Sequence, residues 1–266
     1  MPEEAERQCI ISDFFSKFAI FSSNAYEYTA EKSCIENPIQ KFKCPSGWKL
    51  LVTPTNDPSG LYFETLWHEG DEKNKPSLVF AFRGTEFSKL SDWVSNLRWF
   101  LRWFPHNDQY DIARTKVQGI LEKRWGKEYC NKGVNIYATG HSLGGGIAQH
   151  IAYAFPCITA HVFDPSPVTG YYQLNPPFDA TVVRVYEKGE ILSYPRALLK
   201  STYPVTDNIL EVPQGASFSQ DPAQEHSMAP LAAGILKHAK DKELREIYDD
   251  YRRRTSEKKA AECKKS

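Results

Sequence analysis

The sequence lacks the features that would mark a membrane, secreted or nucleic-acid-binding protein. No apolar run approaches the length of a membrane span, and residues 1–8 are acidic rather than basic, which is atypical of a signal peptide. Lys plus Arg and Asp plus Glu both number 33, so no excess of positive charge favours nucleic acid. We therefore expect a soluble chain without a signal peptide or transmembrane segment, either cytoplasmic or exported by a signal-independent route.

Cysteine is also scarce. The six cysteines are scattered and none forms a C-x-x-C pair, so a disulfide scaffold is not indicated. We expect reduced, mostly structural thiols, although Cys34 and Cys44 could close a small loop in an oxidising compartment. No group of side chains has the spacing of metal ligands, so we expect no metal.

The chain lacks an internal linker rich in proline, glycine or serine. With 266 residues, of which 41% are hydrophobic, it is long enough for one sizeable core, and we expect a single domain over 1–266. Within it, the periodicity of apolar residues predicts a helical cover in 1–47, a core in 48–240 and a charged helix in 241–266 that ends in a solvated basic tail from Arg252.

The strongest functional signal lies in residues 134–148. Alternating apolar residues predict a buried strand, Gly140-His141-Ser142-Leu143-Gly144 has the G-x-S-x-G pattern of a nucleophile elbow, and a helical pattern follows. Glycines two before and two after the serine tolerate the crowded backbone of a sharp strand-to-helix turn. We predict Ser142 as nucleophile and the N–H of Leu143 as an oxyanion donor, whereas His141 packs against a neighbour.

A second apolar strand, residues 77–82, ends in Arg83-Gly84-Thr85-Glu86. Together with the elbow, this segment resembles the class 3 lipases, a branch of the α/β-hydrolases. The resemblance implies an α/β fold with a mostly parallel central sheet flanked by helices, an N-terminal helix and a C-terminal helical extension. In that family a strand ending in R-G-T supplies the second oxyanion donor, which is Thr85 here.

The resemblance continues into an aromatic segment. Asp92-Trp93 lies where the family has a D-W pair, Gln118 replaces a non-catalytic histidine of the family, and residues 97–104 repeat the tetrapeptide L-R-W-F. As a helix, this repeat is either a buried wall of the core or a lid-like surface that contacts lipid, and we favour the lid. The residues assigned to the lid or substrate surface are Trp93, Trp99, Phe100, Trp103 and Phe104.

The triad acid is expected after the strand predicted at residues 181–186. Class 3 lipases place an aspartate just beyond this strand, and Glu190 occupies the corresponding position. The additional methylene is compatible with the role, which is to orient the imidazole and to stabilise its charged form. Glu187, Asp164 and Asp207 remain alternatives.

Of the seven histidines, His226 has the context of the triad base. It precedes a helix that Ser227 is expected to cap, and the family places its histidine in such a loop after the acid. There it would accept the proton of Ser142 and later donate it to the leaving alcohol. His238 is the competing candidate, and we expect it in mid-helix on the surface.

These motifs imply a serine hydrolase that cleaves carboxylic ester bonds of lipids through an acyl-enzyme, with a Ser-His-Glu triad and no cofactor. A lipase or a phospholipase A1-like enzyme fits best. An esterase of small soluble esters and a non-catalytic binding or scaffold protein on a hydrolase fold are the alternatives. The expected partners are a lipid or ester substrate and a peripheral membrane surface. Because no export signal is evident, a toxin-like effector delivered by a dedicated secretion machine is a further hypothesis.

Overall fold

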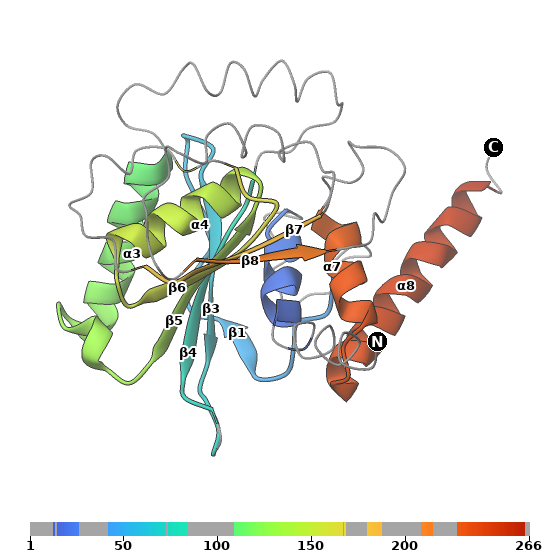
Figure 1. Cartoon of the computed structure of the whole chain (residues 1–266), viewed down its shortest axis with the longest axis horizontal. Helices are drawn as coiled ribbons and strands as arrows, with labels where there is room; N and C mark the ends of the chain where they lie inside the picture. The colour runs from blue at the N-terminus through green and yellow to red at the C-terminus, as the bar shows by residue number, and fades with distance from the viewer. Residues whose placement is uncertain are drawn as a thin grey trace.

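A single sheet organises the protein (Figure 1). The computed structural model describes residues 13, 15–26, 42–72, 74–84, 109–166, 168, 180–187, 209–214 and 228–263. Within these, the sheet has eight strands in the order β1-β3-β4-β5-β6-β7-β8, and β2 pairs with β3 outside this path. The strands are β1 (Trp48–Leu50), β2 (Thr55–Asn56), β3 (Tyr62–His68), β4 (Ser77–Phe82), β5 (Asn135–His141), β6 (Ile158–Phe163), β7 (Val182–Glu187) and β8 (Ile209–Gln214).

The sheet is antiparallel at one edge and parallel elsewhere. β1 and β4 both run antiparallel to β3, whereas every neighbouring pair from β4 to β8 is parallel. Parallel strands need helical crossovers, and their carboxyl ends then meet at one edge of the sheet. The architecture is therefore α/β-hydrolase-like and confirms the predicted fold class.

Helices cover both faces of the sheet (Figure 1). The α3 helix (Gln109–Trp125) and the α4 helix (Leu143–Ala154) pack on one face. The other face carries the N-terminal helix (residues 15–24), α7 (Met228–Lys237) and α8 (Lys242–Cys263). Strand β4 shows the period of two that this requires, because Leu78, Phe80 and Phe82 join the first core and Val79 and Ala81 join the second.

Most predicted elements are confirmed with shifted ends. The strand predicted at 77–82 matches β4, and the strand predicted at 181–186 matches β7 with both ends shifted by one residue. Strand β8 was not predicted from the sequence. None of the helices among the described residues combines the length and apolar character that crossing a membrane requires.

The N-terminal helix is a buried element and not merely a cover. Its serines are as inaccessible as its aromatic residues, since Ser22 and Phe21 are both 0% exposed. The hydroxyl of Ser22 lies 2.8 Å from that of Thr139 on β5, and Thr139 also donates to the carbonyl of His161 at 2.7 Å. These hydrogen bonds satisfy the buried hydroxyls and attach the helix to the two central strands.

Two expectations about the C-terminal helices were wrong. α8 continues through the arginines assigned to a frayed tail, because Asp250 pairs with Arg253 at 2.8 Å and with Arg254 at 2.9 Å. Such pairs, three and four residues apart, stabilise an exposed helix. His238 is exposed as expected, but it follows the end of α7 instead of lying in mid-helix.

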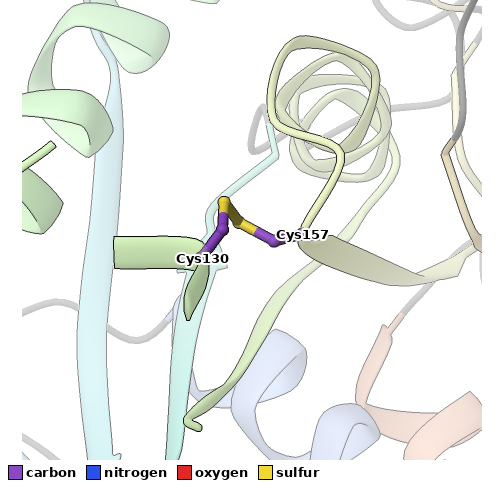
Figure 2. Close-up of a disulfide and its surroundings, with 2 residues drawn as sticks. All are labelled: Cys130 and Cys157. Carbon is purple, nitrogen blue, oxygen red and sulfur yellow. A yellow bond between two sulfur atoms is a disulfide. The ribbon is translucent and has the colours of Figure 1, made fainter. Parts of the chain in front are cut away.

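One disulfide bridges the approaches to two adjacent parallel strands (Figure 2). Cys130 lies in η1 (Tyr129–Asn131) before β5, and Cys157 directly precedes β6; their Cα atoms are 5.4 Å apart. Because α4 returns the chain to the amino edge of the sheet, residues 27 apart in sequence become neighbours. The expectation of reduced thiols was therefore wrong for this pair. Cys44 is also disulfide-bonded, and Cys34 lies outside the described residues.

Candidate functional site

The predicted nucleophile lies on a strained strand-to-helix turn. Ser142 joins the end of β5 to the start of α4 and has φ 55° and ψ −124°. A residue with a Cβ rarely adopts a positive φ, and such strain persists only where the surroundings impose it. This is the backbone conformation that a nucleophile elbow requires.

Close backbone packing explains the glycines of the G-x-S-x-G motif. A Cβ on Gly140 would lie 2.5 Å from the carbonyl oxygen of Gly144 and 2.9 Å from the N of Gly145. A Cβ on Gly144 would lie 2.8 Å from the carbonyl carbon of Phe82 on β4 and closer still to its oxygen. The turn therefore packs closely against β4, and there is no room for a side chain at position 140 or 144.

Hydrogen bonds fix both peptide groups that flank Ser142. Its N–H donates to the carbonyl of Phe163 at the end of β6, at 3.2 Å. Its carbonyl accepts from the N–H of Gly146 at 3.1 Å and from that of Ser166 at 2.9 Å. The Ser142 side chain does not cap α4, although serine commonly does so, and the residue is 6% exposed. Its hydroxyl is thus not committed to holding the helix.

The anion site was predicted at the start of α4. The first hydrogen bond of the helix runs from the N–H of Gly146 to the carbonyl of Ser142. The N–H groups of the residues before Gly146, including that of Leu143, therefore have no carbonyl partner inside the helix. These amides and the helix dipole favour a negative charge at this position. The role of the Leu143 N–H as an oxyanion donor stays a prediction.

The end of β4 meets the elbow from the neighbouring strand. β4 and β5 are paired with Phe82 opposite Gly140, and a Cβ on Gly84 would lie 2.6 Å from the carbonyl oxygen of His141. Gly84 directly precedes Thr85, the predicted second donor, and Thr85 lies outside the described residues. The two motifs on which the oxyanion hole was predicted therefore converge on one edge of the sheet.

The remaining predicted site residues are not described. They are Glu190, His226, Trp93, Trp99, Phe100, Trp103 and Phe104, together with the alternative acid Asp207. His141 is described and packs as predicted, since it is 3% exposed and meets the ring of Tyr26 edge to face at 5.6 Å. Among the described residues, no group of three or more His, Cys, Asp or Glu side chains is arranged to hold a metal ion.

The alternative acid Asp164 lies close to the elbow in the sheet. It follows directly on β6, is fully buried, and has φ 38°, the second positive value at a non-glycine residue among those described. Its N–H donates to the carbonyl of Val185 on β7 at 2.9 Å. Because β6 pairs with β5, this carboxyl group belongs to the same edge of the sheet as Ser142.

A buried arginine on β7 is linked to the elbow by hydrogen bonds through Gln149. Nε of Arg184 donates to Oε1 of Gln149 on α4 at 2.7 Å, and the amide of Gln149 donates to the carbonyls of Gly145 and Ser166 at 3.3 and 3.4 Å. Arg184 is 7% exposed, so its charge depends on such partners. Arg184 was not predicted from the sequence as a site residue. The one feature that could have indicated its buried role is that it is the single charged residue in the otherwise largely apolar strand T-V-V-R-V-Y.

A family model agrees with this geometry. The model of the phospholipase-like family, described as a Tle-like phospholipase domain, matches residues 20–168, more than half of the 266 residues. The curated proteins give no significant match. Among solved structures, the one titled AbyA5 Wildtype is similar at 13% identity, with 78% of this chain and 73% of that chain covered and a TM-score of 0.34. The matched residues include β4, the elbow and the end of β6, and the chain belongs to the phospholipase-like family as a Tle-like phospholipase domain.

Proposed function

We propose that the protein is a serine hydrolase that cleaves a carboxylic ester of phospholipid through an acyl-enzyme. The observation that carries the proposal is Ser142, held at positive φ between β5 and α4 with its hydroxyl not used as a helix cap. Strain of this kind costs on the order of 1–3 kcal/mol and is retained where it serves a mechanism. The family match supports lipid as the substrate class.

The proposed chemistry follows the class 3 lipase pattern. Oγ of Ser142 attacks the ester carbonyl carbon while His226 accepts its proton, and the carbonyl π electrons move onto oxygen. The N–H groups of Leu143 and Thr85 would bind this oxyanion. When the intermediate collapses, the C–O bond to the alcohol breaks and His226 protonates that alcohol. Water then attacks the acyl-enzyme by the same route and releases the carboxylic acid.

Glu190 is the proposed orienting acid, and Asp164 is its competitor. The strand that precedes Glu190 is β7, which confirms the predicted strand but leaves the loop beyond it outside the described residues. Replacing Glu190 with Gln should lower kcat by about 10⁴-fold if it orients the base, since loss of the orienting carboxylate has this effect in other triads. The Asp164→Asn variant is the matched comparison, because both substitutions convert a carboxylate to an amide.

Specificity for the sn-1 ester and a membrane-facing lid remain parts of the proposal. The L-R-W-F repeat at 97–104 combines aromatic side chains that enter a lipid interface with arginines that bind phosphate. We also propose that residues 1–266 fold as one unit, because the N-terminal helix, α7 and α8 share a core with the central strands.

The effector hypothesis gains support from two observations. Tle denotes type VI lipase effector, which agrees with delivery by a secretion machine. The Cys130–Cys157 disulfide is typical of proteins that work in an oxidising compartment. A delivered phospholipase would meet both membrane lipid and an oxidising environment after it leaves the cytoplasm.

Two measurements test the proposal together. A fluorophosphonate probe should label the native protein, and Ser142→Ala should remove the label while the far-UV spectrum stays unchanged. Mass spectrometry of products from mixed vesicles should then show 2-acyl lysophospholipid and free fatty acid. Hydrolysis of short soluble esters without attack on vesicles would instead identify an esterase. A folded protein that neither takes the label nor releases any acid would contradict the enzyme proposal and favour a scaffold.

A further inference from the structure

Tyr26 reaches the elbow from the end of the N-terminal helix. Its hydroxyl oxygen lies 2.8 Å from Nδ1 of His141 and 3.2 Å from the carbonyl oxygen of the same residue. A phenol has one hydrogen to donate, so both contacts are hydrogen bonds at once when Nδ1 is protonated: the ring donates to the phenol oxygen, and the phenol donates to the carbonyl. Tyr26 thus satisfies a side-chain and a backbone group of one residue.

This carbonyl belongs to the peptide group that sets the φ angle of Ser142. The other end of the same group, the N–H of Ser142, donates to the carbonyl of Phe163 at 3.2 Å. The peptide plane between His141 and Ser142 is therefore held at its oxygen by a tyrosine and at its nitrogen by β6. A plane held at both ends can maintain the positive φ that would otherwise relax.

The same hydroxyl also touches the strand that carries the second motif. A Cβ built on Gly84 would collide with the phenol oxygen of Tyr26, so the tyrosine packs directly on the backbone before Thr85. Tyr26 consequently contacts one residue of each proposed oxyanion motif, Gly84 of the R-G-T that follows β4 and His141 of the elbow at the end of β5. It is 115 residues from His141 in sequence.

We propose that Tyr26 is a positioning residue of the active site, whose hydroxyl fixes the His141–Ser142 peptide against the end of β4. The proposal rests on Ser142 being the nucleophile. Tyr26 contributes no proton or electrons to the reaction. It acts by preorganising the serine and the oxyanion donors, and misplacement of such groups by about 1 Å is sufficient to cost on the order of 100-fold in rate.

The test is Tyr26→Phe, which keeps the ring and removes the hydroxyl. Tyr129→Phe is the control, since Tyr129 is half-buried like Tyr26 but lies in η1 before β5, at the edge of the sheet opposite Ser142. We expect Tyr26→Phe to lower kcat on a short soluble ester by about 10- to 100-fold at unchanged KM. The control should keep wild-type kcat. Rates are normalised to native protein by far-UV circular dichroism, so that loss of folded enzyme does not count as loss of turnover.

Three outcomes separate the possibilities. A fall in kcat confined to Tyr26→Phe, together with an equal fall in the rate of fluorophosphonate labelling, supports positioning. Equal kcat for Tyr26→Phe, the control and the wild type overturns it, whatever the melting temperatures are. If Ser142→Ala retains full activity, the nucleophile assignment itself fails, and the positioning role fails with it.

Discussion

Removing the Cys130–Cys157 disulfide offers the most quantitative test of the fold. The bond closes a loop between residues 27 apart in sequence. In the chain-entropy treatment, such a loop lowers the entropy of the unfolded chain by about 12 cal/mol/K, or about 3.6 kcal/mol at 25 °C. Replacing both cysteines with serine should therefore lower the free energy of unfolding by about this amount. For a chain of this size, the melting temperature should fall by roughly 7–14 °C.

The assay is urea unfolding of both proteins with and without dithiothreitol. Wild type under oxidising conditions should be the more stable by about 3.6 kcal/mol, with similar dependence on denaturant if the native surface is unchanged. Because Cys44 is also disulfide-bonded, dithiothreitol alone would reduce more than one bond, and the double serine variant isolates the contribution of this one.

Two results would refute the reasoning. A loss below about 1 kcal/mol in the double variant would mean that closing this loop does not govern the unfolded chain as supposed. Alkylation of Cys130 and Cys157 in unfolded protein kept free of reductant would show that the bond is absent. Specific activity at 25 °C should remain unchanged, since the disulfide lies at the edge of the sheet opposite Ser142.

Other substitutions test the elbow and the buried histidine. Gly144→Ala should destabilise the protein by about 1–3 kcal/mol or more, because the added Cβ would collide with the backbone of Phe82. Gly119→Ala, on the exposed face of α3 with open space around it, should stabilise the protein by up to about 1 kcal/mol. Thermal melting compares the two variants, and equal shifts in melting temperature would contradict the packing explanation. Burial lowers the pKa of His161 to about 3, so the unfolded chain binds a proton below pH 6.5 while the native protein does not. Stability should therefore fall by about 2 kcal/mol between pH 7.5 and pH 5, and continue to fall toward pH 3. His161→Phe, which retains stacking on Phe18, should flatten this dependence in urea unfolding, and an unchanged slope would exclude His161 as its source.

Local sequence was sufficient to find the central strands of the sheet. The continuous apolar run in residues 77–82 and the G-x-S-x-G motif each involve only a few neighbouring residues, and the structure confirms β4 and the turn at Ser142. The glycines of G-x-S-x-G predicted the turn because the crowding that requires them arises largely between residues close in sequence. The triad assignments at Glu190 and His226 are different, because they depend on how loops that are distant in sequence come together. They therefore remain predictions.

The features that were missed depend on contacts between distant segments. Cys130 and Cys157 show no short motif, and only a parallel crossover brings them together. The buried role of Arg184 depends on Gln149, which lies 35 residues earlier on a different element. The link between Tyr26 and His141 spans an even longer separation. In each case the residue type alone is compatible with an ordinary surface position.

The positive φ of Ser142 has a consequence for engineering this protein. Glycine adopts that conformation without the steric penalty that a Cβ imposes, so Ser142→Gly should be more stable than the wild type. Directed evolution that rewards heat resistance alone would then enrich glycine at this position and remove the proposed nucleophile. A library screened for robustness therefore needs a simultaneous selection for ester hydrolysis.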